Sequence, residues 1–409
     1  MKFFLAGAAL GLASASSLLG QSLFDLAPDL AEDDSFPLTW TAGVNVGYDD
    51  NATPLTGKEQ DTLYLDAYVG ASLLNSSPQT TTELYARVGA TRYLDSLDTR
   101  QVDVDETAPN AGLGLNVTHR LNERLRLVSN NYVRYERQPD FSTGVIGANQ
   151  IGDYLTWSSD NAVGYRWSER FATYTGVTFS GVEYDEDSVR GDVSSWAVYN
   201  QFRYQLTEQT LLTAGLRYQD RDVDSAADTQ NLFVTAGVEH RFSPTSVFTL
   251  KTGAQIREID GKSGRETSPY AEAALRSRIN ESFSVRAYTR YSVEDYNRVI
   301  GQSVYDNVNT LRVGVTGNYA VSEALALSAG VNYANLSYED GVRNGSDAPD
   351  ADENLLNLFA GFKLRVTENL FLNGSYNYTD FSGDSEARAG GFGPDYDRQR
   401  VSLGVSTTF

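Results

Sequence analysis

The last nine residues of the sequence are Val401-Ser-Leu-Gly-Val-Ser-Thr-Thr-Phe409, and they are the strongest indication of the fold. Val401, Leu403, Val405 and Phe409 alternate with small polar residues, which is the period-two pattern of a strand with one apolar face. Chain ends of soluble proteins are usually frayed and polar. A transmembrane β-barrel needs its last strand to pair with its first, because lipid tolerates no open sheet edge. The ending therefore predicts a closed β-barrel.

The composition agrees with a barrel and disfavours other classes. The chain has 409 residues, of which 41% are hydrophobic, and it contains 25 Tyr and no Cys. After position 20 it has no apolar run of about 20 residues, the length that a membrane helix needs. The lack of cysteine excludes a disulfide framework and a cysteine nucleophile. The net charge of −21 disfavours nucleic acid as a partner.

The amino-terminal segment has the features of an export signal. Lys2 precedes an apolar run over residues 3–12, and Ala13-Ser-Ala15 offers a small-residue cleavage site. We expect residues 1–20 to be a signal peptide and residues 21–37 to be a short acidic periplasmic segment. The barrel is expected over residues 38–409, with no cofactor.

A repeated unit of strand, polar loop, strand and tight turn begins at Leu38. The tight turns carry Pro, Asn, Ser and Thr, which suit sharp reversals, and they recur at the spacing of one hairpin plus one longer loop. They lie at residues 75–79, 120–124, 168–170, 207–210, 243–246, 280–282, 322–323 and 367–369. Eight turns join nine up-and-down pairs, which predicts an all-β, antiparallel, up-and-down barrel of about 18 strands, or 16 if one pair is irregular.

The alternation of apolar and polar residues differs in clarity between strands. It is clear over residues 38–48, 232–242, 248–256 and 356–366, whereas the two faces mix over 124–135 and 170–184. A soluble β-sandwich also alternates, but its strands are usually about 5–6 residues long. Long strands and two unequal loop classes favour a membrane barrel with short periplasmic turns and longer outer loops.

Acidic and basic residues occupy different predicted places. Carboxylates crowd the predicted outer loops at 95–106, 185–187, 220–228, 347–353 and 380–397, whereas basic residues concentrate on predicted inward faces. The inward candidates are Arg87, Arg166, Arg203, Arg217, Arg241, Lys251, Arg257, Arg276, Arg312, Lys363 and Arg365, with Arg278, Arg286 and Arg290 beside them. Fewer acids face inward, among them Asp66, Glu239 and Glu272. Such a wall either favours anions in an aqueous pore or consists of locally paired and solvated arginines.

Catalytic residues are not evident. The two histidines, His119 and His240, fall at the inner ends of strands, beside predicted periplasmic turns. A His–Asp or Ser–His site of an outer-membrane enzyme would instead lie near the outer rim. We therefore expect interfacial histidines, no metal site and no enzyme.

The hairpin periodicity and the terminal Val401-Ser-Leu-Gly-Val-Ser-Thr-Thr-Phe409 resemble the β-barrel porin families of Gram-negative outer membranes. Some of these families are found with exopolysaccharide export systems. The resemblance covers residues 38–409. The end of the chain resembles the C-terminal insertion signal of these proteins, and the residues that carry it are Val401, Leu403, Val405 and Phe409. It implies an integral outer-membrane location, contact with lipid and lipopolysaccharide, and insertion by the barrel assembly machinery.

Three functions remain open from the sequence. The first is a passive channel for small hydrophilic solutes, in which Arg217, Arg241, Arg276 and Arg312 would control ion preference. The second is a structural or polysaccharide-export-associated barrel without an open pore, and the third is an adhesin or receptor acting through acidic loops. Candidate constriction loops are residues 138–153, 337–354 and 380–397. The outward positions reveal no lipid-excluded face, so monomer and trimer are not distinguished.

Overall fold

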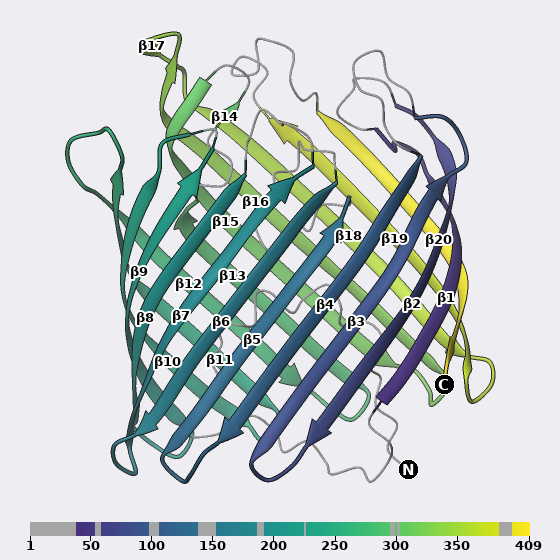
Figure 1. Cartoon of the computed structure of the whole chain (residues 1–409), viewed down its shortest axis with the longest axis horizontal. Helices are drawn as coiled ribbons and strands as arrows, with labels where there is room; N and C mark the ends of the chain where they lie inside the picture. Colours follow the sequence, from purple (N-terminus) through teal and green to yellow (C-terminus); the bar gives the residue numbers. More distant parts are fainter. Residues whose placement is uncertain are drawn as a thin grey trace.

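The computed structural model describes residues 38–53, 59–97, 106–137, 153–185, 192–224, 226–294, 299–300, 303–383 and 395–409. These residues form one antiparallel sheet that closes on itself, with strongly tilted strands (Figure 1). The predicted signal peptide and acidic segment, residues 1–37, lie outside the described residues, as does most of the candidate loop 138–153.

Eighteen long strands in the described residues make up the barrel wall, and each pairs with its neighbours in chain order. They are β1 (Leu38–Asp49), β2 (Thr62–Ser76), β3 (Thr80–Tyr93), β4 (Thr107–Arg120), β5 (Leu125–Glu136), β6 (Tyr154–Arg166), β7 (Phe171–Tyr184), β8 (Val193–Gln205), β9 (Thr210–Val223), β10 (Thr229–Ser243), β11 (Ser246–Ile259), β12 (Glu266–Arg278), β13 (Phe283–Val293), β15 (Ser303–Ala320), β16 (Leu325–Arg343), β18 (Ala351–Arg365), β19 (Leu370–Gly383) and β20 (Tyr396–Thr408). Two further pieces, β14 (Val299–Ile300) and β17 (Ser346–Asp347), pair only with β15 and β16. The predicted 18-strand barrel is confirmed.

The carboxyl-terminal strand closes the barrel as expected. β20 pairs antiparallel with β1, so that Val405 lies opposite Val44 and Leu403 opposite Val46. The backbone of Phe409 continues this pairing, since its amide donates to Trp40 at 3.0 Å and its carbonyl accepts from Trp40 at 2.9 Å. The pairing of the two strands thus continues to the last residue, so that this seam leaves no open sheet edge in lipid.

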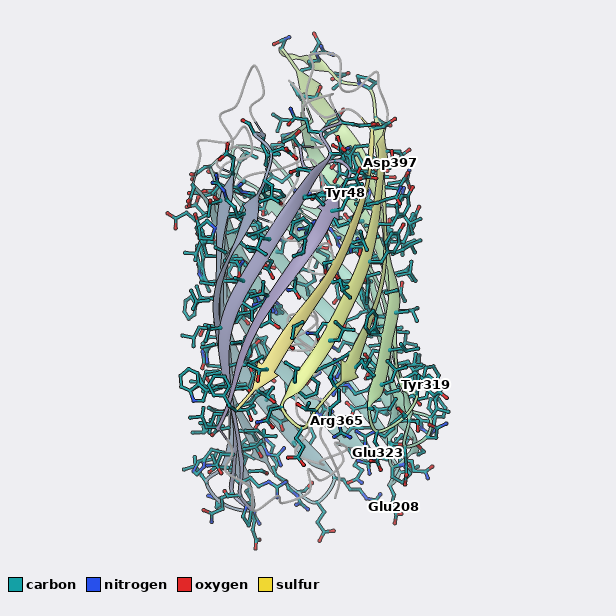
Figure 2. All side chains as sticks on the ribbon, turned by 90° about the vertical axis from the view of Figure 1, so that its right-hand side faces the viewer. Tyr48, Glu208, Tyr319, Glu323, Arg365 and Asp397 are labelled. Carbon is teal, nitrogen blue, oxygen red and sulfur yellow. The ribbon has the colours of Figure 1, made fainter. Side chains whose placement is uncertain are left out.

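The outer face of the barrel is apolar. Val44, Val46, Leu403 and Val405 are each 47–54% exposed, although they are aliphatic and lie in mid-strand. An apolar band on the outside of a closed barrel is the surface that lipid covers in outer-membrane proteins. Figure 2 shows the two ends of the barrel, with Glu208 and Glu323 at the short turns and Asp397 at the opposite end. The protein is an integral outer-membrane β-barrel.

Several predicted outer loops are wrong in their bounds because the strands continue into them. β16 reaches Arg343 and β18 begins at Ala351, so most of residues 337–354 is sheet and cannot fold inward as a constriction loop. A tight reversal at Asn344 and Gly345, both with positive φ, joins β16 to β17. Likewise β9 extends to Val223, and β19 and β20 take both ends of residues 380–397.

Candidate functional site: the inner wall

Contacts that skip one strand identify the inner face. Arg203 on β8 donates from Nη2 to Oε2 of Glu239 on β10 at 2.6 Å, across the intervening β9. Gln255 on β11 donates to the carbonyl of Val293 on β13 at 3.1 Å, across β12. Curvature brings next-nearest strands together on the concave side only. Residues in register with these side chains therefore face the interior.

All eleven basic candidates lie on this inward face, because each alternates with the exposed apolar residues of its strand. They are Arg87, Arg166, Arg203, Arg217, Arg241, Lys251, Arg257, Arg276, Arg312, Lys363 and Arg365. Their distribution is uneven, since six of them sit on β8 to β12. Their part in conduction stays a prediction.

Three of these residues lie beside the three acids expected on the inward face. Arg203 pairs with Glu239 at 2.6 Å, whereas Arg87 is 3.6 Å from Asp66 and Lys251 is 3.6 Å from Glu272. Arg87 also stacks over the ring of Tyr68, 3.9 Å from its centroid. Each of these pairs contributes little net charge to the wall.

A buried cluster forms where β13 ends. Glu294 accepts from Arg312 at 2.7 Å and from Arg290 at 2.7 Å, and the side chains of Arg312 and Glu294 are only 7% and 8% exposed. Burial alone would raise the pKa of Glu294, but the Arg312 and Arg290 guanidinium groups outweigh it and hold this pKa at about 2. The sequence pattern did not single out Glu294, because it follows the last alternating residue of its strand.

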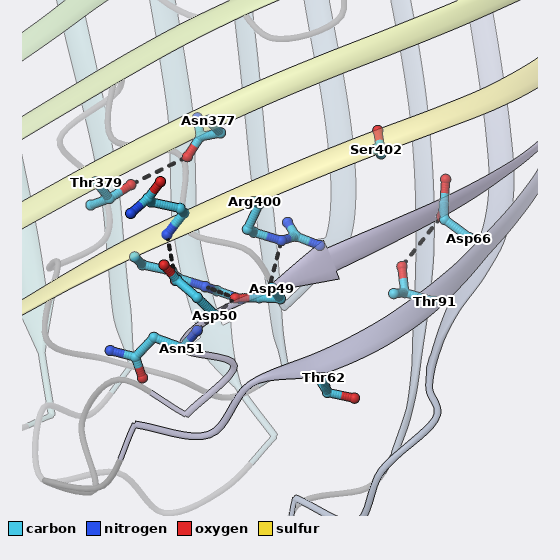
Figure 3. Close-up of polar contacts among 12 residues, drawn as sticks. Asp49, Asp50, Asn51, Thr62, Asp66, Thr91, Asn377, Thr379, Arg400 and Ser402 are labelled. Carbon is cyan, nitrogen blue, oxygen red and sulfur yellow. Dashed lines mark hydrogen bonds and ion pairs between the residues drawn. The ribbon is translucent and has the colours of Figure 1, made fainter.

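The seam between β1 and β20 contains a second cluster of the same kind. Asp49 is fully buried, and its carboxylate accepts a hydrogen bond from Nε of Arg398 at 2.9 Å. It also forms an ion pair with Arg400, whose Nε lies 3.0 Å from Oδ2 of Asp49. Figure 3 shows Arg400 reaching Asp49 across the seam. The guanidinium of Arg400 also lies 4.7 Å from the ring centroid of Tyr64 on β2. One carboxylate thus ties the first strand to the last.

Arg276 and Arg286 form the opposite kind of arrangement. They lie directly across from each other on β12 and β13. Both are exposed, and within the described residues neither makes an ion pair or a side-chain hydrogen bond. Arg241 lies in the same row two strands away, because Arg241 pairs with Val247 and Val247 with Arg276. Arg276 and Arg286 therefore carry positive charge that no neighbouring carboxylate in the described residues offsets.

The histidines do not form a site. Nδ1 of His119 lies 2.7 Å from Oγ1 of Thr80, and Nδ1 of His240 lies 3.0 Å from Oγ1 of Thr210. Both side chains alternate with inward residues and so face outward near the short turns. Across the described parts of the chain, no group of three or more His, Cys, Asp or Glu side chains could hold a metal ion. Among the same residues, no helix is long and apolar enough to cross a membrane.

Comparison with known proteins gives structural likeness only. No family model and no curated protein sequence matches the chain. Solved structures with a similar shape include OpdK of Pseudomonas aeruginosa with vanillate (11% identity, TM-score 0.48, 91% of this chain and 99% of that one). OccAB4 of Acinetobacter baumannii is similar at 12% identity and TM-score 0.45, with 92% and 99% covered. A BenF-like porin of Pseudomonas fluorescens has 11% identity and TM-score 0.45, with 91% and 98% covered. The function is therefore argued from the residues of this chain.

Proposed function

We propose that the protein is a passive outer-membrane channel for small hydrophilic solutes, with a preference for anions set by its inner wall. Barrels of about 16–18 strands are wide enough to enclose an aqueous passage. The observation that carries the proposal is the facing pair Arg276 and Arg286, whose positive charges lie on the inner face without a carboxylate partner in the described residues. Fixed charges on a pore wall favour ions of opposite sign.

The ion pairs of the inner wall indicate which of the predicted arginines can control ion preference. Among the four predicted to control ion preference, Arg312 is held against Glu294 at 2.7 Å. Its positive charge is largely offset there, and its removal would leave a buried carboxylate. Arg276 has no such tie, and its neighbour Arg286 shares its position on the wall. The test of selectivity therefore centres on Arg276 and Arg286.

Single-channel recording of the mature protein in planar bilayers tests the proposal. We expect stepwise conductance and, under a salt gradient, a reversal potential of the sign that indicates anion preference. A folded, heat-modifiable barrel without conductance would contradict the channel. Conductance with cation preference would leave a channel but contradict the role of the basic wall.

A barrel without an open pore is the second candidate function. It is favoured by a cluster of apolar side chains buried in the barrel interior, near the end opposite the short turns. Tyr305, Tyr338 and Phe381 are at most 2% exposed and belong to one apolar cluster with Leu336 and Leu355. Side chains this well covered narrow the interior where β15 to β20 reach beyond the apolar band. The absence of conductance in the recording above is the result that would favour this candidate.

A further inference from the structure

The outer wall of β5 and β6 carries a polar ring in a position where lipid is expected. Ser129 and Asn131 on β5 pair in register with Asn161 and Ser159 on β6, and all four side chains alternate with inward residues. Ser129 donates to Oδ1 of Asn161 at 2.7 Å, and Asn161 donates from Nδ2 to Ser159 at 2.9 Å. Ser159 donates to Oδ1 of Asn131 at 2.6 Å, and Asn131 donates from Nδ2 to Ser129 at 2.8 Å. The hydrogen bonds thus form a closed ring of four side chains.

This ring lies at mid-depth of the membrane band. On the side of the short turns it is followed by Leu127 and Val163, which are 38% and 45% exposed, and on the other side by Val133 and Trp157. On β20 the corresponding mid-strand outward residues are aliphatic, as Leu403 and Val405 show. Outward mid-strand polar residues elsewhere in the described wall include single threonines between apolar neighbours, such as Thr252 on β11 and Thr289 on β13. The ring differs from these because its four polar side chains bond to one another across two strands.

A second polar pair lies beside the ring, on the next two strands. Asn200 on β8 donates from Nδ2 to Oγ1 of Thr175 on β7 at 2.6 Å, also on the outward face. The Oδ1 atom of Asn200 is buried and has no hydrogen-bond partner. We call these six residues of β5 to β8, namely Ser129, Asn131, Ser159, Asn161, Thr175 and Asn200, the outer polar patch.

The ring satisfies only part of its hydrogen-bonding capacity. Each asparagine amide has two N–H groups and an oxygen with two lone pairs, and each uses one N–H and one lone pair in the ring. Acyl chains offer no partner for the rest, so lipid contact leaves these groups unsatisfied. Polar side chains of this kind hydrogen-bond between proteins within membranes. The outer polar patch is thus better covered by protein than by lipid.

We propose that the outer polar patch is the contact surface for a second copy of this chain. The patch carries no charge, and each of its amides and hydroxyls can both donate and accept, so an identical patch is chemically complementary to it. In a twofold contact the same residues face each other from both subunits. The depth of the ring excludes a soluble partner, because the apolar residues on either side hold it within the membrane.

Disulfide crosslinking tests this contact cleanly, because the chain has no cysteine of its own. Ser159→Cys places a thiol in the patch, and Val313→Cys on β15 is the matched control on an apolar part of the wall at the far side of the barrel. In native outer membranes treated with a mild oxidant, we expect a dimer of this chain from Ser159→Cys and little from Val313→Cys. No dimer from Ser159→Cys, equal yields from both variants, or a crosslinked species containing another protein would each overturn the proposal.

A second variant removes the polar ring without adding a crosslink. Ser129→Ala, Asn131→Leu, Ser159→Ala and Asn161→Leu together replace it by apolar side chains that suit lipid. We expect the purified barrel to remain heat-modifiable and its mass in detergent to fall from that of a dimer to that of a monomer. A quadruple variant that keeps the dimer mass, or a wild-type protein that is already monomeric, would overturn the proposal.

Discussion

Arginines of the inner wall have different surroundings in two regions, the seam of β1 and β20 and the junction of β12 and β13. At the seam, Arg398 and Arg400 both contact the buried carboxylate of Asp49. At β12 and β13, Arg276 and Arg286 face each other without a carboxylate in the described residues. Arginine around a buried acid holds strands together, whereas arginine without an acid leaves charge available to whatever enters the barrel. Neighbouring acids thus distinguish arginines that tie strands together from arginines that carry uncompensated charge, and we propose that the second kind favours anions.

The largest effect is expected from Asp49→Asn. This change leaves Arg398 buried without its counter-charge, and breaking one side of a buried ion pair typically costs about 3–5 kcal/mol. We expect a clearly lower urea midpoint for the refolded barrel in lipid vesicles. Glu83→Gln is the control, because the contact of Glu83 with Asn116 is exposed. Equal urea midpoints for the two variants would contradict the claim that arginines around a buried acid hold the strands together.

A smaller effect is expected from acidification at Glu294. Its pKa is lowered from 4.5 to about 2, so the stabilisation is complete above pH 4.5 and is lost as the pH falls through the folded-state value near 2. A pKa difference of this size corresponds to roughly 3 kcal/mol when it is lost completely. We expect the urea midpoint of the wild type to fall between pH 6 and pH 3 by more than that of Glu294→Gln. Parallel pH profiles would contradict the role of this carboxylate.

The smallest effect is expected from Arg87→Gln. The Arg87 side chain is 36% exposed and 3.6 Å from Asp66, so solvent screens the pair. Pairs of this kind typically contribute less than about 1 kcal/mol. The change in urea midpoint should therefore be well below that of Asp49→Asn. A comparable loss would mean that exposure does not distinguish the ion pairs of the inner wall.

The sequence predicted the architecture well, because barrel closure imposes a strict period-two pattern. The apolar face of residues 401–409 and the eight tight turns carry this information locally. The bounds of the outer loops were wrong at β16 and β18, because strand pairing there continues beyond the apolar band through residues of mixed polarity. Polarity marks where lipid ends, which is not where the sheet ends.

The site was less predictable, since it depends on register between distant residues. Nothing local places Glu294 between Arg290 and Arg312, or Asp49 beside Arg398, which is 349 positions away in the chain. The mixed faces noted over residues 124–135 have a concrete cause in the outward Ser129 and Asn131. These two polar residues interrupt the apolar alternation, so the pattern alone did not show whether this face contacts lipid or protein.

Ion selectivity of two matched double variants tests the central claim most directly. Arg276→Gln with Arg286→Gln removes two positive charges without an acid partner, whereas Lys251→Gln with Glu272→Gln removes one charge of each sign. Under a salt gradient, the first variant should lose anion preference by on the order of 1 kcal/mol, about fivefold in the permeability ratio, and the second should resemble the wild type. Unchanged selectivity in the first variant, or an equal loss in both, would contradict the claim that arginines without acid partners set the function of the inner wall.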